Sequence, residues 1–89
     1  MTKQEVEQLL NNAMQLTVEL LERTPDDSRL KYVKDELDRI KGLMKGHWSF
    51  NDDEKANIHI GVFAVRELEG FHDELAVMLE HLNYEIDNS

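Results

Sequence analysis

The sequence predicts an all-α fold, a small antiparallel four-helix bundle. The chain has 89 residues, enough for one modest hydrophobic core, and its 40% hydrophobic and 33% charged content is typical of a globular protein. Apolar side chains recur at three- and four-residue spacing through most of its length, and there is only one proline. We therefore expect a single helical domain over residues 1–89, with helices at about 3–23, 26–45, 52–69 and 72–86.

The first helix is expected to begin with a capping box. The hydroxyl of Thr2 can accept a hydrogen bond from the third helical amide, and Glu5 can reach back to the amide of Thr2. The positions that follow form an apolar face at helical spacing: Val6, Leu9, Leu10, Ala13, Met14, Thr17, Leu20 and Leu21.

The second helix is separated from the first by Thr24-Pro25-Asp26-Asp27. Proline biases the residue before it away from helical dihedrals and suits a first helical position, and aspartates favour a helix N-terminus. The helix should start near Pro25 or Ser28, and Gly46 is a natural stop. Its core positions are Leu30, Val33, Leu37, Ile40 and Met44.

The third helix is expected after a loop that contains the single tryptophan, with Asn51 as cap and Glu54 three residues later. Trp48 either closes the end of the core or serves as a binding anchor. Alternating apolar residues at 58–62 also fit a strand, but the longer window holds a helical period and no second strand-like run exists. We assign to the core Ile58, Gly61, Val62, Val65 and Leu68.

The fourth helix should follow a stop at Gly70, with Phe71 packed behind that glycine and Asp73 and Glu74 in the first turn. Its core positions are Leu75, Met78, Leu79, Leu82 and Ile86.

Charge is distributed unevenly along the chain. The net charge is −9; residues 1–66 hold 12 acidic and 10 basic side chains, whereas residues 67–89 hold seven acidic and no basic ones. This field disfavours nucleic acid and anionic membranes and favours a basic partner. Solubility of a small domain is a sufficient alternative reason for it.

The chain has no cysteine, which excludes thiolate zinc sites and fits a reducing cytoplasm. No apolar run approaches the roughly 20 residues that span a bilayer, and the N-terminus has no signal-peptide pattern. No nucleophile–base arrangement or phosphate-binding glycine loop is present, so we expect neither an enzyme nor a cofactor. The alternative of a metal-binding helical bundle depends on four histidines alone: His47, His59, His72 and His81.

The stretch at residues 58–75 resembles a known family. It contains Ile58-His59-Ile60-Gly61, then Ala64-Val65-Arg66-Glu67-Leu68-Glu69, then Glu74-Leu75, with Tyr84 further on. Together with the preceding helix and the turn at Phe50-Asn51, this pattern is similar to the small helical immunity proteins of type VI secretion systems that protect against NAD(P)-degrading (NAD glycohydrolase) toxins. The resemblance covers residues 25–84.

The resemblance implies a cytoplasmic inhibitor that binds the catalytic domain of a cognate toxin and blocks its NAD(P) pocket. A pocket for a pyrophosphate is basic, so carboxylates can occupy the same field. We predict Glu67, Glu69 and Asp73 as phosphate surrogates, and include His72 at the same corner. The predicted apolar contacts are Trp48, Phe50 and Phe71. An acidic adaptor or regulatory module that binds another protein remains the alternative, and a homodimer of the free chain is left open.

Overall fold

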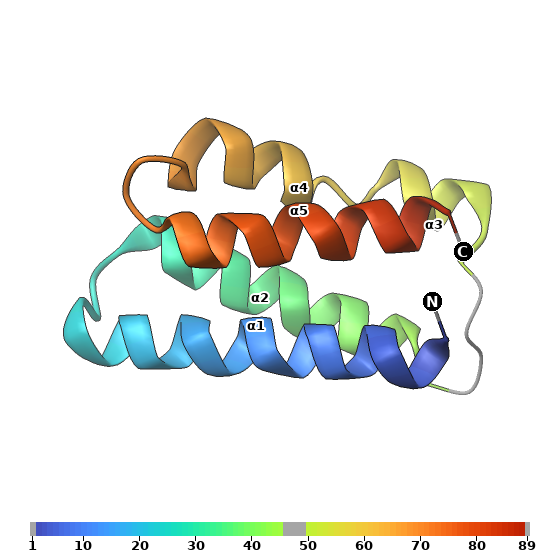
Figure 1. Ribbon diagram of the computed structural model, residues 1–89, viewed down its shortest axis with the longest axis horizontal. Coiled ribbons are helices and arrows are strands. Elements are labelled where there is room, and N and C mark those ends of the chain that lie inside the picture. The colour runs from blue at the N-terminus through green and yellow to red at the C-terminus, as the bar shows by residue number, and fades with distance from the viewer. Residues whose placement is uncertain (1, 46–49, 89) are drawn as a thin grey trace.

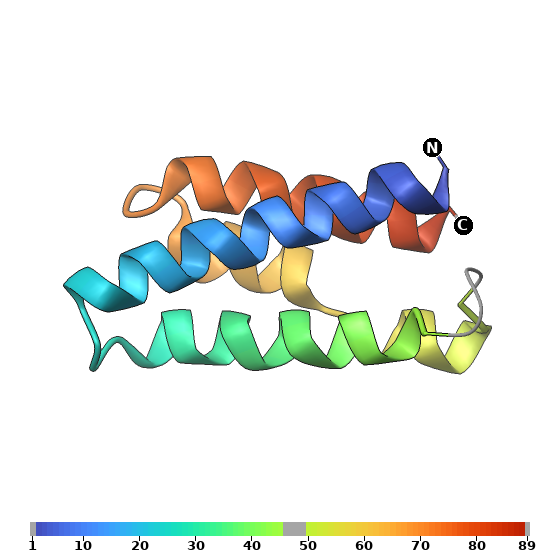
Figure 2. The ribbon, with the colours of Figure 1, turned by 90° about the horizontal axis from the view of Figure 1, so that it is seen from below.

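The computed structural model describes residues 2–45 and 50–88, and these residues form helices and turns without any strand (Figure 1). The all-α prediction is confirmed. Residues 28–43 run opposite to residues 3–23, residues 52–68 run back in the direction of residues 3–23, and residues 73–87 run opposite to them again. The start of the first helix and the end of the last therefore lie at the same end of the molecule (Figures 1 and 2).

Helix α1 spans Lys3–Arg23 and begins with the predicted capping box. The amide of Glu5 donates to Thr2 Oγ1 at 3.2 Å, and the amide of Thr2 donates to Glu5 Oε1 at 3.2 Å. One face is buried along the helix. It includes Thr17, whose hydroxyl donates to the Ala13 carbonyl at 2.7 Å, so this buried polar group is satisfied within its own helix.

Helix α2 spans Ser28–Leu43, somewhat shorter than the expected 26–45. Its cap is Asp27, whose Oδ1 accepts from the amides of Arg29 at 2.9 Å and Leu30 at 3.3 Å. Because these bonds satisfy two of the free amides of the first turn, the helix starts after Asp27 rather than at Pro25. Its buried residues are Leu30, Val33, Leu37 and Ile40.

The prediction of one continuous helix over residues 52–69 is wrong. The structure divides this segment into α3 (Asp52–Ala56), α4 (Ile60–Phe63) and the π-helical turn η1 (Ala64–Leu68). The expected capping box of Asn51 and Glu54 does begin α3. The helix ends at Asn57, whose carbonyl accepts from Arg39 Nη2 of α2 at 2.8 Å, and Ile58 then enters the core.

This division changes which side chains are buried. Ile60, Ala64 and Leu68, four residues apart, are fully buried, whereas Val62 and Val65 are 54% and 51% exposed, so their assignment to the core is wrong. In η1 the Glu69 amide donates to the Ala64 carbonyl, five residues back, at 3.1 Å. A π-turn has more residues per turn than an α-helix, and a four-residue spacing therefore stays on one face.

Helix α5 spans Asp73–Asp87, and its buried face is formed by Leu75, Ala76, Leu79, Leu82 and Ile86. It packs against α1, α4 and η1 (Figure 1). Between η1 and α5 the chain turns at Gly70, which has φ of 90°, a conformation that a side chain strongly disfavours. The predicted stop at Gly70 is confirmed, but Phe71 is 70% exposed and not packed behind it.

Candidate partner-binding site

The predicted site centres on the turn between η1 and α5, and backbone hydrogen bonds hold this turn in shape. The carbonyl of Leu68 accepts from the amides of Phe71 at 3.0 Å and His72 at 2.8 Å. The Asp73 carboxylate accepts from the Gly70 amide at 2.6 Å. The Asp73 side chain therefore stabilises the turn, and it is also exposed to solvent.

Arg29 of α2 ties this turn to the body of the molecule. Its Nη1 donates to the carbonyl of Glu67 at 3.2 Å, and its guanidinium carbon lies 4.9 Å from the centre of the Phe71 ring. A guanidinium over an aromatic face is an attractive arrangement. Phe71 is thus held at the surface with its other atoms still open to solvent.

Asp27 completes the contact between α2 and the turn. Its Oδ1 lies 3.6 Å from Arg29 Nε, and its Oδ2 lies 3.9 Å from His72 Nε2. Partial burial acts to raise the pKa of Asp27. The hydrogen bonds from the backbone amides of Leu30 and Arg29, together with the positive charge of Arg29, outweigh this effect and leave the pKa below its usual 3.8. Asp27 is therefore a fixed anion that supports both α2 and the turn.

The predicted site residues do not all gather at one place. Glu67, Glu69, Phe71 and Asp73 are exposed, and His72 is half-buried beside Asp27. Phe50 is only 5% exposed and belongs to the hydrophobic core, which leaves it little surface for a partner. Trp48 lies outside the described residues. The part of the site that the structure brings together is thus the surface of residues 67–73, which we call the acidic corner.

One carboxylate near this corner was missed by the sequence analysis. Glu80 of α5 lies beside Glu69, and the two carboxyl groups can share a hydrogen bond when one of them is protonated. Partial burial, the charge of Glu69 and this hydrogen bond together raise the pKa of Glu80 above its usual 4.5. Nothing in the sequence indicates the pairing, because it joins residues from two elements across a turn.

The described residues hold no cluster of metal ligands. In the described ranges, no three His, Asp or Glu side chains gather to hold an ion. Glu69 and His72 have the spacing of a Glu-x-x-His pair, but both stand in the turn around Gly70, and His72 faces Asp27 instead. In the same ranges, no helix has the length and apolar character needed to cross a membrane.

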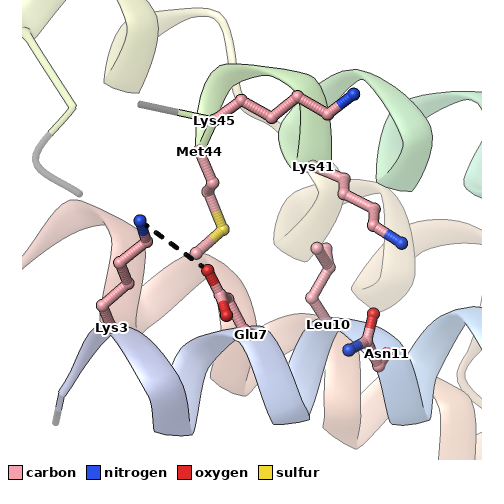
Figure 3. A pocket seen from close by; sticks show the side chains of 7 residues that line it. All are labelled: Lys3, Glu7, Leu10, Asn11, Lys41, Met44 and Lys45. Carbon is pink, nitrogen blue, oxygen red and sulfur yellow. Dashed lines mark ion pairs between the residues drawn. The ribbon is translucent and has the colours of Figure 1, made fainter. Parts of the chain in front are cut away.

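A separate hollow of about 220 Å³ lies between the start of α1 and the end of α2 (Figure 3). Lys3 and Glu7 form an ion pair of 3.9 Å at its edge, and Lys41 and Lys45 stand on the opposite side. Exposed amines and an exposed ion pair contribute little binding energy, and no nucleophile–base pair lies among the seven lining residues. We assign no chemistry to this hollow.

The fold and these surfaces define a class: a small acidic helical protein whose exposed features suit binding to another protein. The comparison with known families agrees, since the model of the Tsi6 family matches residues 5–88. The chain belongs to the Tsi6 family, a family of type VI secretion immunity proteins rather than of enzymes. No curated protein and no solved structure matched the chain. The resemblance to type VI immunity proteins is confirmed.

Proposed function

We propose that this chain binds the catalytic domain of a cognate NAD(P)-degrading toxin and blocks its NAD(P) pocket. Membership of the Tsi6 family is the observation that carries the proposal, because an immunity protein acts by binding its toxin. Since the substrate of such a toxin is the cellular NAD(P) pool, we propose that the protection takes place in the cytoplasm.

The acidic corner is the proposed contact with that pocket. Glu67 and Glu69 are exposed, and no basic residue follows Arg66 in the sequence. Arg29 holds the backbone of Glu67 and the ring of Phe71, so the corner would meet a partner without first being ordered. A preformed surface loses less conformational entropy on binding. Fixed carboxylates suit a pocket that otherwise binds pyrophosphate through amides and basic groups.

The test combines binding with enzymatic protection. The chain is mixed with the catalytic domains of candidate NAD(P)-degrading toxins from the same genome, and NAD(P) consumption is measured with and without the chain. We expect stoichiometric inhibition and co-elution in size-exclusion chromatography. A toxin domain that neither co-elutes nor is inhibited would remove the proposal and favour the acidic adaptor.

Charge reversal then tests the corner itself. We expect Glu67→Lys with Glu69→Lys to weaken inhibition and slow association about tenfold or more, because complementary charge raises the association rate. The matched control is Glu7→Lys with Asp35→Lys, which changes net charge equally at exposed positions of α1 and α2. Equal inhibition by both double variants would show that the corner is not the contact.

A further inference from the structure

An exposed apolar strip lies beside the acidic corner. Val62 of α4, Val65 of η1 and Tyr84 of α5 are 54%, 51% and 63% exposed. They line one shallow hollow of about 290 Å³ together with Gly61, Glu80, Asn83 and Asp87. Single exposed apolar residues are ordinary on a protein surface. Three that share one hollow form a contiguous apolar patch, and exposing such a patch to water is unfavourable in free energy.

The floor of this hollow is held rigidly. The Gly61 amide donates to Asn83 Oδ1 at 2.8 Å, and Asn83 Nδ2 donates to Asp87 Oδ2 at 3.1 Å. A Cβ atom at position 61 would stand only 2.9 Å from the Cβ of Asn83, so only glycine permits this approach of α4 to α5. The strip is therefore a preformed surface rather than a loose side-chain arrangement.

The rim of the hollow is acidic. Glu80 and Asp87 belong to its lining, Glu69 lies beside Glu80, and none of the seven lining residues is basic. Glu69 and Glu80 repel each other when both are charged, which is one of the reasons why the pKa of Glu80 is raised. A cation placed beside the two carboxylates would relieve that repulsion.

The chemistry of the occupant follows from this combination. A basic side chain with an apolar stem, arginine above all, can lay its stem on the valines, stack its guanidinium on Tyr84 and reach the carboxylates. A second copy of the chain is a poor occupant, because a symmetric contact would bring this acidic surface against itself. An anionic membrane is disfavoured for the same reason.

We propose that Val62, Val65, Tyr84 and Glu80 form a second contact with the toxin's catalytic domain, holding a basic side chain of that domain beside the Glu69–Glu80 pair. The inference rests on the proposed function and adds to it. The acidic corner meets the NAD(P) pocket, and the strip anchors the toxin surface next to it, which extends the interface from η1 along α5.

The experiment measures the Kd for the same toxin domain, carrying a substitution that abolishes its activity, by calorimetry. Val65→Ser and Tyr84→Ala should each weaken binding about tenfold, as expected for truncated central contacts. Glu80→Lys should weaken it at least as much, and Glu80→Gln less. The matched control is Val77→Ser, since Val77 is a 66% exposed valine of α5 outside the hollow. It should bind within about twofold of the unaltered chain.

The outcomes separate the two proposals. If the unaltered chain binds and protects but Val65→Ser and Tyr84→Ala match Val77→Ser, the strip is not a contact and the proposed function stands. If the unaltered chain does not bind, both proposals fall. Analytical ultracentrifugation of the free chain tests whether a second copy binds the strip. If the unaltered chain is a dimer, and Tyr84→Ala makes it a monomer without changing the affinity for the toxin, the strip is a dimer contact and the inference is overturned. Thermal unfolding of each variant verifies the fold.

Discussion

At the scale of single residues, Asp27 shows how one carboxylate serves two elements. It caps α2 through two amides and lies near Arg29 and His72, which contact the turn before α5. Its pKa in the folded protein is below its usual value of 3.8. Lowered pKa in the folded state means that the charged form stabilises the fold, so this contribution is present above pH 3.8 and lost as pH falls through the folded-state pKa.

We expect Asp27→Ala to lower the free energy of unfolding by about 1 kcal/mol at pH 7, the usual effect of removing a helix cap. Urea denaturation should show a difference from the unaltered chain that becomes smaller as pH falls below 3.8, because the charged form of Asp27 is then progressively lost. Asp27→Asn is the control, since it keeps an acceptor for the cap without the charge. A difference that does not change with pH would contradict a role for the charge.

At the scale of the elements, the region from α3 to η1 decides which surface the protein presents. The prediction of a regular helix over 52–69 assigned Val62 and Val65 to the core. The break at Asn57 and the π-turn at Ala64–Leu68 place Ile60, Ala64 and Leu68 there instead and leave the two valines outside. Single π-turns are frequent at functional sites, which accords with the proposed role of the strip.

Gly61 tests how closely α4 must approach α5. Gly61→Ala would place a methyl group 2.9 Å from Asn83 Cβ and strain the hydrogen bond at that point, so we expect a loss of about 1–3 kcal/mol in unfolding free energy. Gly42→Ala is the matched control. A Cβ there meets nothing within 4 Å, and alanine in a helix should stabilise by about 0.5–1 kcal/mol. Equal effects in thermal denaturation would refute the close approach.

At the scale of the whole molecule, negative charge is concentrated in the last quarter of the chain. The last 23 residues hold seven acidic and no basic side chains in a chain of net charge −9. Most of them belong to α5, which runs the length of the molecule beside α4 and η1 (Figure 1). The acidic corner and the rim of the apolar strip therefore share one electrostatic field.

We expect the association rate with the toxin domain to fall about tenfold between roughly 50 and 500 mM salt, because salt screens the attraction that steers the two surfaces together. Stopped-flow fluorescence measures this rate. The Glu67→Lys, Glu69→Lys variant should show a shallower dependence on salt. A rate that is independent of salt for the unaltered chain would exclude electrostatic steering.

Local signals in the sequence predicted the helix starts well. The capping boxes at Thr2 and Asn51 and the stop at Gly70 all lie where residue type alone placed them. These features depend on hydrogen bonds between residues three apart, or on the backbone freedom of one residue. Apolar periodicity likewise identified most of the core of α1, α2 and α5.

The candidate site could be predicted only in part. The exposed acids of the corner were found from composition, but the Glu69–Glu80 pair, the stacking of Arg29 on Phe71 and the exposed valines were not. Arg29 and Glu67, which are hydrogen-bonded, are 38 residues apart in the sequence, and Gly61 and Asn83 are 22 residues apart. No pattern within a helical turn contains such pairings.

By itself, the sequence determined an all-helical chain, the capped starts of α1 and α3, and an acidic last quarter, since these depend on local hydrogen bonding, apolar spacing and charge count. Only the tertiary structure decided which side of residues 58–68 is buried. There the contact of Gly61 with Asn83, the bond from Arg39 to Asn57 and the burial of Ile60 outweigh the preference of the segment for a regular helix. Packing between distant segments thus decides which side chains of residues 58–68 are exposed.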